Sequence, residues 1–233
     1  MTSQNNLESK FESLVAQLSI PENLEKLYRH GIHQIFTLLH GDHPHMTYYD
    51  YNPHNYGLRL LTPFYGGSFD RHTCIQDYSD IDAYFLYKDL TPDKDLSGED
   101  LFNKILSQID FLQQTSYYYR GYTDDFPRIK LLRDHHLRHA VPIEVDFQRE
   151  RFKLDCIPAI QLNSENDLLI PHYEETTKVN PTKDYNALRR LNVKYNGRIT
   201  KFILLIKYWN EINEHILKSY LIERLVEKIF SEH

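Results

Sequence analysis

The segment "GGSFDRHTCIQDYSDIDAYF", residues 66–85, places a glycine-rich turn before a strand-like run that opens with two acids. Asp80 and Asp82 share one face of a strand, because side chains alternate with a period of two. Two carboxylates this close raise a pKa or destabilise the strand unless a cation lies between them. Mg²⁺ suits this position because it prefers carboxylate and phosphate oxygens. A solvated acid pair at a strand edge, with no metal, is the alternative interpretation.

A third acid lies in another strand-like run. Asp155, in "FKLDCIPAI", is a charge in an apolar setting that needs a partner. Three carboxylates from two strands predict a site for two Mg²⁺ ions about 4 Å apart, the arrangement that holds attacking and leaving oxygens in phosphoryl transfer. Asp146, in "VPIEVDFQ", is a rival for the third position.

Several other residues are suited to binding a nucleotide. The turn at Gly67 and Ser68 lets backbone N–H groups approach a phosphate with no Cβ in the way, although it is also compatible with an ordinary tight turn. Lys207, in the apolar run "FILLIKYWN", either extends to the surface or meets a phosphate. Ser219 lies at a predicted helix start, which favours an anion or a simple cap. Tyr220 either stacks on a base or packs in the core.

Hydrophobic periodicity and turn residues predict the elements that position these side chains. Helices are expected at residues 5–19, 22–40, 98–114, 183–196, 198–213 and 219–231. Strands are expected at "LRLLTPFY", "DIDAYFLY", "RIKLLR", "VPIEVDFQ" and "FKLDCIPAI", the last two as a hairpin, with loops at residues 41–57 and 163–184. This order predicts an α+β lobe over residues 1–165 and a helical lobe over residues 166–233, with the active site in a cleft between them.

The composition narrows the class of partner. The 233 residues carry a net charge of −6, which argues against a long nucleic acid as partner but allows a small anionic substrate. The two cysteines, Cys74 and Cys156, fit a reducing compartment. The first residues do not form a signal peptide, and no apolar run approaches the roughly 18 residues of a membrane helix. The chain is therefore expected to be cytoplasmic, with no membrane partner.

The spacing of these residues resembles a known signature. Gly67-Ser68, Thr73 and Ser79-Asp80-Ile81-Asp82 are similar to the G-S-x(4)-T-x(5)-S-D-x-D pattern of the DNA-polymerase-β-like nucleotidyltransferases. "LDCIPA" resembles the segment that supplies the third metal aspartate in the branch containing the oligoadenylate synthetases, cyclic GMP-AMP synthase and the bacterial cGAS/DncV-like nucleotidyltransferases (CD-NTases). "VNPTKDYNAL", "LLIKYWN" and "LKSYLIERL" resemble, in the family's order, the entry to the helical lobe, the helix with a triphosphate-binding lysine, and the next helix start.

The resemblance implies a polymerase-β-like lobe with a mixed sheet, plus a helical lobe. It implies two Mg²⁺ ions, with Mn²⁺ as a substitute, held by Asp80, Asp82 and Asp155, and Thr73 is interpreted as structural. By the same resemblance, the phosphates of a nucleoside triphosphate such as ATP are held by Gly67, Ser68, Lys207 and Ser219, and Tyr220 stacks on the base.

The implied reaction joins nucleoside triphosphates, as donor and acceptor, into a cyclic or linear oligonucleotide second messenger and releases pyrophosphate. In the bacterial branch such messengers activate an effector in antiphage (CBASS-type) defence. Two alternatives remain: a nucleotidyltransferase that modifies an RNA 3′ end or a protein, and an inactive nucleotide-binding regulator. Relatives generally continue beyond the helix that begins at Ser219, so the helical lobe ending at His233 is expected to be that of a minimal enzyme, a truncated product or a fragment.

Overall fold

A computed structural model describes residues 2–40, 58–77, 79–89, 97–118, 126–132, 139–162, 167–172 and 175–232. The loop predicted at residues 41–57 lies outside these ranges. The chain forms two compact units, one built from residues 1–25, 66–79 and 182–233 and the other from residues 26–65 and 80–181. The predicted division between residues 165 and 166 stays a prediction.

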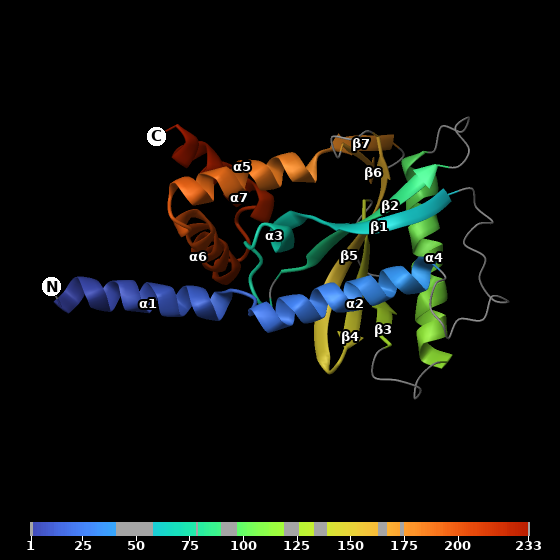
Figure 1. Cartoon of the computed structure of the whole chain (residues 1–233), viewed down its shortest axis with the longest axis horizontal. Coiled ribbons are helices and arrows are strands. Elements are labelled where there is room, and N and C mark those ends of the chain that lie inside the picture. The colour runs from blue at the N-terminus through green and yellow to red at the C-terminus, as the bar shows by residue number, and fades with distance from the viewer. Residues whose placement is uncertain are drawn as a thin grey trace. The chain divides into compact units, whose positions relative to one another are not determined.

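The second unit is built on one mixed sheet of seven strands (Figure 1). The strands are β1 (Leu58–Tyr65), β2 (Ile81–Asp89), β3 (Arg128–Leu131), β4 (Val141–Phe147), β5 (Glu150–Gln161), β6 (Leu168–His172) and β7 (Glu175–Val179). The order is β1-β2-β5-β4-β3, and β6 pairs with both β5 and β7. Strands β2 and β5 are parallel, whereas the other pairs are antiparallel. The α+β class and the hairpin of β4 and β5 are therefore confirmed.

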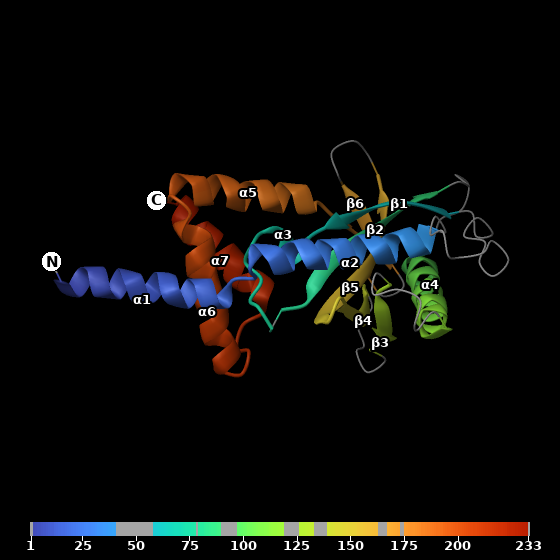
Figure 2. The same cartoon turned by 60° about the horizontal axis from the view of Figure 1, so that its bottom comes forward.

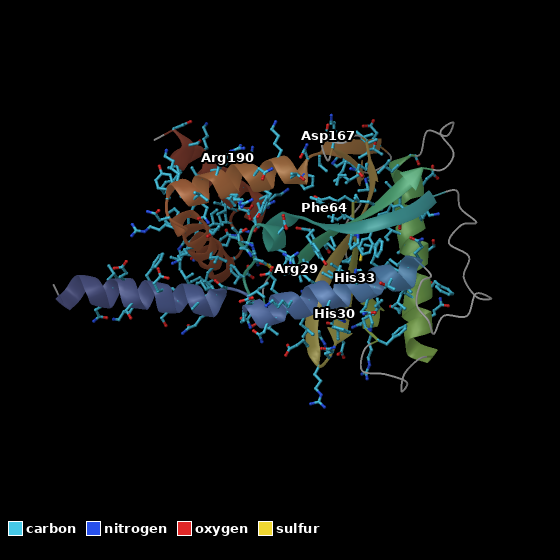
Figure 3. The ribbon with its side chains drawn as sticks, in the orientation of Figure 1. Arg29, His30, His33, Phe64, Asp167 and Arg190 are labelled. Atoms are coloured by element: carbon cyan, nitrogen blue, oxygen red, sulfur yellow. The ribbon has the colours of Figure 1, made fainter. Side chains whose placement is uncertain are left out.

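Two helices pack on this sheet. The part of α2 (Glu22–His40) that belongs to this unit approaches it closely, because a Cβ at Gly31 would lie 3.1 Å from the ring of Phe147. His30 of the same helix stacks on Phe147 with ring centres 5.4 Å apart, and Figure 3 shows it beside His33 along α2. Helix α4 (Gly98–Tyr118) contacts β3, β5 and β6. It buries the predicted apolar face, which includes Leu101, Ile105 and Ile109.

The first unit is helical (Figure 2). Its elements are α1 (Thr2–Leu18), the single turn α3 (Gly67–Asp70), α5 (Pro181–Lys194), α6 (Arg198–Ile212) and α7 (Ser219–Ser231). Proline suits the first position of α5, because that residue needs no backbone N–H for the helix. A core of Leu191, Ile203 and Val226 joins α5, α6 and α7. A second core joins α1 to α6 through contacts that include Val15 and Leu204.

One prediction of local structure is wrong. The predicted loop at residues 163–184 contains β6 and β7, which pair from Leu168 with Val179 to His172 with Glu175. β6 is apolar but only five residues long and contains Pro171, and β7 is polar, so neither shows a clear alternation. Pairing of β6 with β5 and of β7 with β6 supplies the backbone hydrogen bonds that stabilise them. The turn predicted at residues 66–68 forms the N-cap and first two residues of α3, which is a single helical turn. Among the helices that the structure describes, none is long and apolar enough to cross a membrane.

Candidate active site

Two of the three predicted acids lie side by side on the sheet. Asp82 on β2 and Asp155 on β5 are register partners in the parallel pair, so their side chains lie on the same face. Both are half-buried. Asp80 is exposed and directly precedes β2. The fold therefore brings together acids that are far apart in the chain.

The electrostatics of these acids are unfavourable without a ligand. The pKa of Asp155 is raised from 3.8 to about 7, chiefly by burial and then by repulsion from Asp82 and Asp80. Attraction from Lys153 opposes the rise but is the smallest contribution. A raised carboxyl pKa means that the folded site favours a neutralising charge, which either a proton or a metal ion can provide.

The donor set fits Mg²⁺ bound together with a substrate. Among the residues that the structure describes, no group of three or more His, Cys, Asp or Glu side chains could hold a metal ion. Mg²⁺ seldom needs such a group, because it is usually bound by one or two carboxylates together with phosphate oxygens and water. The pair of Asp82 and Asp155 matches that requirement.

The rival acid Asp146 is placed away from this pair. On β4 the residue opposite Asp155 is Pro142, and Asp146 lies four residues further along, opposite Arg151. At about 3.3 Å per strand residue, this separation is roughly 13 Å. The sheet therefore groups Asp155, rather than Asp146, with Asp82.

The predicted phosphate-binding turn lies in the helical unit. Gly67 has a φ of +59°, in the left-handed region that favours glycine. The backbone N–H of Thr73 donates to the carbonyl of Ser68 at 2.9 Å, and the Thr73 hydroxyl lies 3.4 Å from the same oxygen. Thr73 is fully buried, in agreement with a structural role.

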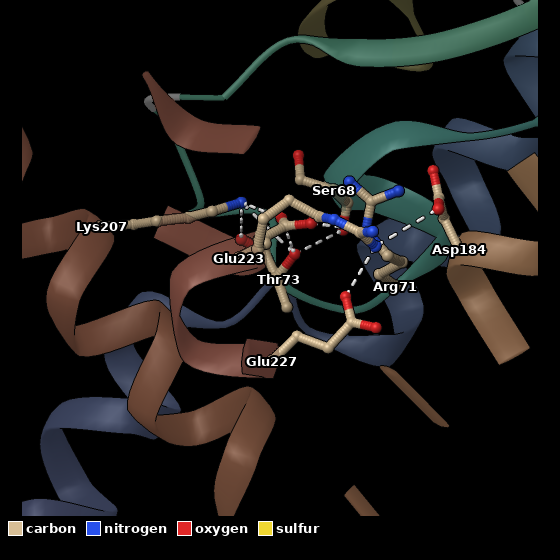
Figure 4. Close-up of polar contacts among 8 residues, drawn as sticks. Ser68, Arg71, Thr73, Asp184, Lys207, Glu223 and Glu227 are labelled. Carbon is tan, nitrogen blue, oxygen red and sulfur yellow. Dashed lines mark hydrogen bonds and ion pairs between the residues drawn. The ribbon is translucent and has the colours of Figure 1, made fainter. Parts of the chain in front are cut away.

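Lys207 lies in a buried polar network (Figure 4). Its side chain is 4% exposed, and its ammonium donates to the Thr73 carbonyl at 3.0 Å, to the Thr73 hydroxyl at 3.3 Å and to Glu223. The Glu223 carboxylate also accepts from the Thr73 hydroxyl and from Arg71 Nε, each at 2.6 Å. We call Arg71, Thr73, Lys207 and Glu223 the Glu223 cluster. Lys207 therefore does not extend to the surface.

Burial and pairing act in opposite directions within the Glu223 cluster. Burial lowers the pKa of Lys207, and attraction to Glu223 only partly offsets that effect. Burial alone would raise the pKa of Glu223, but the attraction of Lys207 and Arg71 outweighs burial and leaves that pKa below its usual value. The carboxylate is thus the charge that holds two cations in place.

Helix α7 presents the last two predicted residues. Lys218 occupies the N-cap position, so the interpretation of Ser219 as a simple cap is wrong and Ser219 is the exposed first residue of the helix. Tyr220 is 55% exposed, so its alternative assignment to the core is also wrong. The Arg224 guanidinium lies 5.9 Å from the centre of the Tyr220 ring. The predicted roles of Ser219 and Tyr220 on a nucleotide stay predictions.

Sequence reasoning missed Glu223 and Arg71. A signal for Glu223 was present, because Ile222 and Val226 place it on the buried side of an amphipathic helix. A carboxylate there, together with a lysine in an apolar helix, indicates a buried ion pair. Arg71 had no comparable signal, because an arginine after a turn is ordinarily solvated.

Comparisons of the fold identify similar solved structures. No protein-family model matches the chain, and no curated protein sequence matches it. E. coli CdnC, solved in complex with a HORMA protein, matches with a TM-score of 0.60 and 16% identity over 96% of this chain and 64% of that chain. The STING-associated c-di-GMP synthase CdnE of Capnocytophaga granulosa matches with a TM-score of 0.57 and 16% identity over 91% of this chain and 62% of that chain.

A third match is the cyclic AMP-GMP synthase DncV of Vibrio cholerae, solved with a linear dinucleotide intermediate. Its TM-score is 0.59 and its identity 12%, over 94% of this chain and 71% of that chain. The chain spans 64% of the length of CdnC and 62% of that of CdnE. At such low identity these matches establish the fold, and the predicted CD-NTase fold is confirmed.

Proposed function

We propose that this chain, which has the fold of the CD-NTases, is a metal-dependent nucleotidyltransferase that joins nucleoside triphosphates, ATP among them, into a cyclic or linear oligonucleotide second messenger. The observation that carries the proposal is the register pairing of Asp82 with Asp155. Burial first, and then repulsion from Asp82, raise the pKa of Asp155 to about 7. A scaffold has no need for such a repulsive pair, whereas phosphoryl transfer uses a cluster of acids to hold metal ions.

Each residue has a defined role in the proposed reaction. Asp80, Asp82 and Asp155 would hold Mg²⁺, which when bound supplies positive charge to the phosphates and orients them. The turn at Gly67 and Ser68 contacts the phosphates through backbone N–H groups and a hydroxyl.

Further residues complete the nucleotide site. Ser219 donates to the phosphates at the start of α7. Lys207 supplies positive charge to the phosphates while its ammonium donates to the carbonyl of Thr73. Tyr220 stacks on the base.

The chemical step is a displacement at the α-phosphorus of the donor nucleotide. A ribose hydroxyl of the acceptor forms the new O–P bond, the bond to the bridging oxygen breaks, and pyrophosphate leaves. By resemblance to the family, Asp155 is the acid best placed to accept the proton of the attacking hydroxyl while it binds metal. Positioning and charge neutralisation supply most of the remaining catalysis.

The product would act as a signal in bacterial antiphage defence, made in the cytoplasm and read by a separate effector. CdnC, CdnE and DncV support the synthesis of a nucleotide signal through their shared fold, since CdnE is a c-di-GMP synthase and DncV a cyclic AMP-GMP synthase.

The deciding experiment is incubation with the four ribonucleoside triphosphates and Mg²⁺ or Mn²⁺, followed by mass spectrometry of phosphatase-treated products. The matched control is the double variant Asp80→Ala/Asp82→Ala. A small oligonucleotide made by the wild type and absent from the control supports the proposal. If label is transferred from ATP to an added RNA or protein and no free oligonucleotide forms, the synthase proposal is wrong. The chain would then be a nucleotidyltransferase that modifies a macromolecule.

A further inference from the structure

Arg71 is the member of the Glu223 cluster with hydrogen-bond donors left over. Its Nε donates to Glu223, and its two terminal nitrogens make no hydrogen bond or ion pair with any residue in the described part of the chain. The Arg71 side chain is nevertheless only 10% exposed. Neither terminal nitrogen is among the fully buried, unpaired side-chain atoms of the described residues, so both reach the surface, where a ligand can supply the acceptors.

The charge of the Glu223 cluster also favours an anion. Arg71 and Lys207 are both cationic, and Glu223 is the one carboxylate in contact with either of them within the described residues. The cluster therefore carries a formal charge of +1 in largely buried surroundings, where charges interact more strongly than in water. Repulsion between two buried cations is relieved when an anion binds beside them.

The position of the Glu223 cluster indicates which kind of anion would bind beside it. Arg71 directly follows α3, the turn that contains Gly67 and Ser68. The hydrogen bonds of Thr73 to Ser68 and to Glu223 join the cluster to that turn. Figure 4 shows Ser68, Arg71, Thr73 and Glu223 in one group of polar contacts. Phosphate oxygens are good acceptors for the forked N–H groups of arginine.

We infer that Arg71 contacts the polyphosphate of the nucleotide directly, and that Glu223 is a positioning residue that holds Arg71 and Lys207. This inference deepens the proposed function and rests on it for the identity of the nucleotide. The ammonium of Lys207 donates to three protein acceptors, so Lys207 contributes charge while Arg71 contributes the contact.

The test is calorimetric titration with inorganic tripolyphosphate in EDTA, where neither a base nor a metal takes part. For Arg71→Gln we expect the affinity for tripolyphosphate to fall about tenfold or more, because charge-assisted hydrogen bonds to phosphate are lost. Arg190→Gln is the matched control, since Arg190 is exposed on α5, and it is expected to bind as the wild type does. Equal affinities for Arg71→Gln and the wild type would overturn the inference.

A second variant separates positioning from charge. Glu223→Gln makes the cluster more positive, so a purely electrostatic effect would strengthen tripolyphosphate binding. We expect the affinity to fall instead, because the carboxylate no longer fixes the Arg71 guanidinium. An unchanged or higher affinity would overturn the positioning role.

These measurements are independent of turnover. If no oligonucleotide is made but Arg71→Gln loses tripolyphosphate binding, the synthase proposal fails and the polyphosphate site stands. If the wild type is an active synthase and Arg71→Gln binds normally, the inference about Arg71 fails alone.

Discussion

The Asp82–Asp155 pair and the Glu223 cluster show two ways in which one chain handles charges removed from water. In the Glu223 cluster a carboxylate is surrounded by Lys207, Arg71 and a hydroxyl, and its pKa lies below its usual value. At the paired strands a carboxylate faces other carboxylates, and the pKa of Asp155 is raised to about 7. The carboxylate of the first group has its counter-charges in the protein, whereas Asp155 is repelled by the acids beside it, so its site favours a neutralising proton or cation.

The largest effect is expected from removing the counter-charge in the Glu223 cluster. Glu223→Ala leaves Lys207 and Arg71 largely buried without their carboxylate, so we expect the free energy of unfolding to fall by about 3–5 kcal/mol. Urea denaturation measures this change. The double variant Lys207→Met/Glu223→Leu should recover much of the loss, because it removes both members of the pair. A loss below about 1 kcal/mol for Glu223→Ala would contradict a buried network.

A substitution in the pair of Asp82 and Asp155 is expected to raise the free energy of unfolding rather than lower it. In EDTA at pH 8, Asp155→Asn should raise the free energy of unfolding by about 1–3 kcal/mol, because it removes a repelled carboxylate. The folded pKa of about 7 lies above the unfolded value of 3.8, so the folded state holds this proton more tightly. The protonated Asp155 carboxyl therefore contributes to the free energy of unfolding of the wild type below about pH 4, and this contribution is lost as the pH rises through 7.

The matched control for that change is Asp146→Asn, on the neighbouring strand and away from the pair. Chemical denaturation at several pH values compares the two variants. In Asp155→Asn, the free energy of unfolding should no longer decline as the pH rises from 4 to 7. In Asp146→Asn, that decline should remain. If both variants keep the decline, another group causes it.

A smaller effect is expected from metal binding to the same acids. At a Mg²⁺ concentration ten times the dissociation constant, mass action stabilises the folded wild type by about 1.4 kcal/mol. We expect thermal unfolding at pH 8 to show a higher midpoint with Mg²⁺ than with EDTA, and Asp80→Ala/Asp82→Ala to show little change. The same increase in that double variant would place the bound metal elsewhere.

The smallest effect is expected at a lysine–glutamate ion pair that, unlike Lys207–Glu223, is partly exposed to solvent. Lys201 contacts Glu12 at 2.7 Å, but the two side chains are 34% and 49% exposed. Lys201→Ala should lower stability by less than about 1 kcal/mol, and the difference from the wild type should shrink in 1 M salt. Thermal unfolding at two salt concentrations measures both quantities.

The sequence predicted the elements that carry the acids better than the contacts between them. Periodicity located β2, β5 and α7 to within a few residues, because each has a clear apolar pattern. It did not predict that β2 and β5 are parallel neighbours, since pairing depends on long-range packing. Strands β6 and β7 were missed because β6 is short and contains Pro171, and because the polar β7 has no apolar alternation.

The contacts of Lys207 could not be predicted for a similar reason. The type and spacing of Asp80, Asp82 and Lys207 could be read along the chain, but the partner of Lys207 could not. Glu223 meets Lys207 only because α6 and α7 pack together at the depth set by Ile203 and Val226. A lysine in an apolar helix therefore predicts a partner without saying whether the partner is a substrate or the protein itself.

The parallel pairing of β2 with β5 also bears on how the molecule folds. The residues between Asp82 and Asp155 include α4, β3 and β4, so the two acids can meet only after a long stretch of chain has been ordered. Contacts between residues far apart in sequence form slowly, because the loop between them must close first. In a refolding experiment, recovery of Mg²⁺ affinity would therefore follow the return of helical signal, and it would report completion of the sheet.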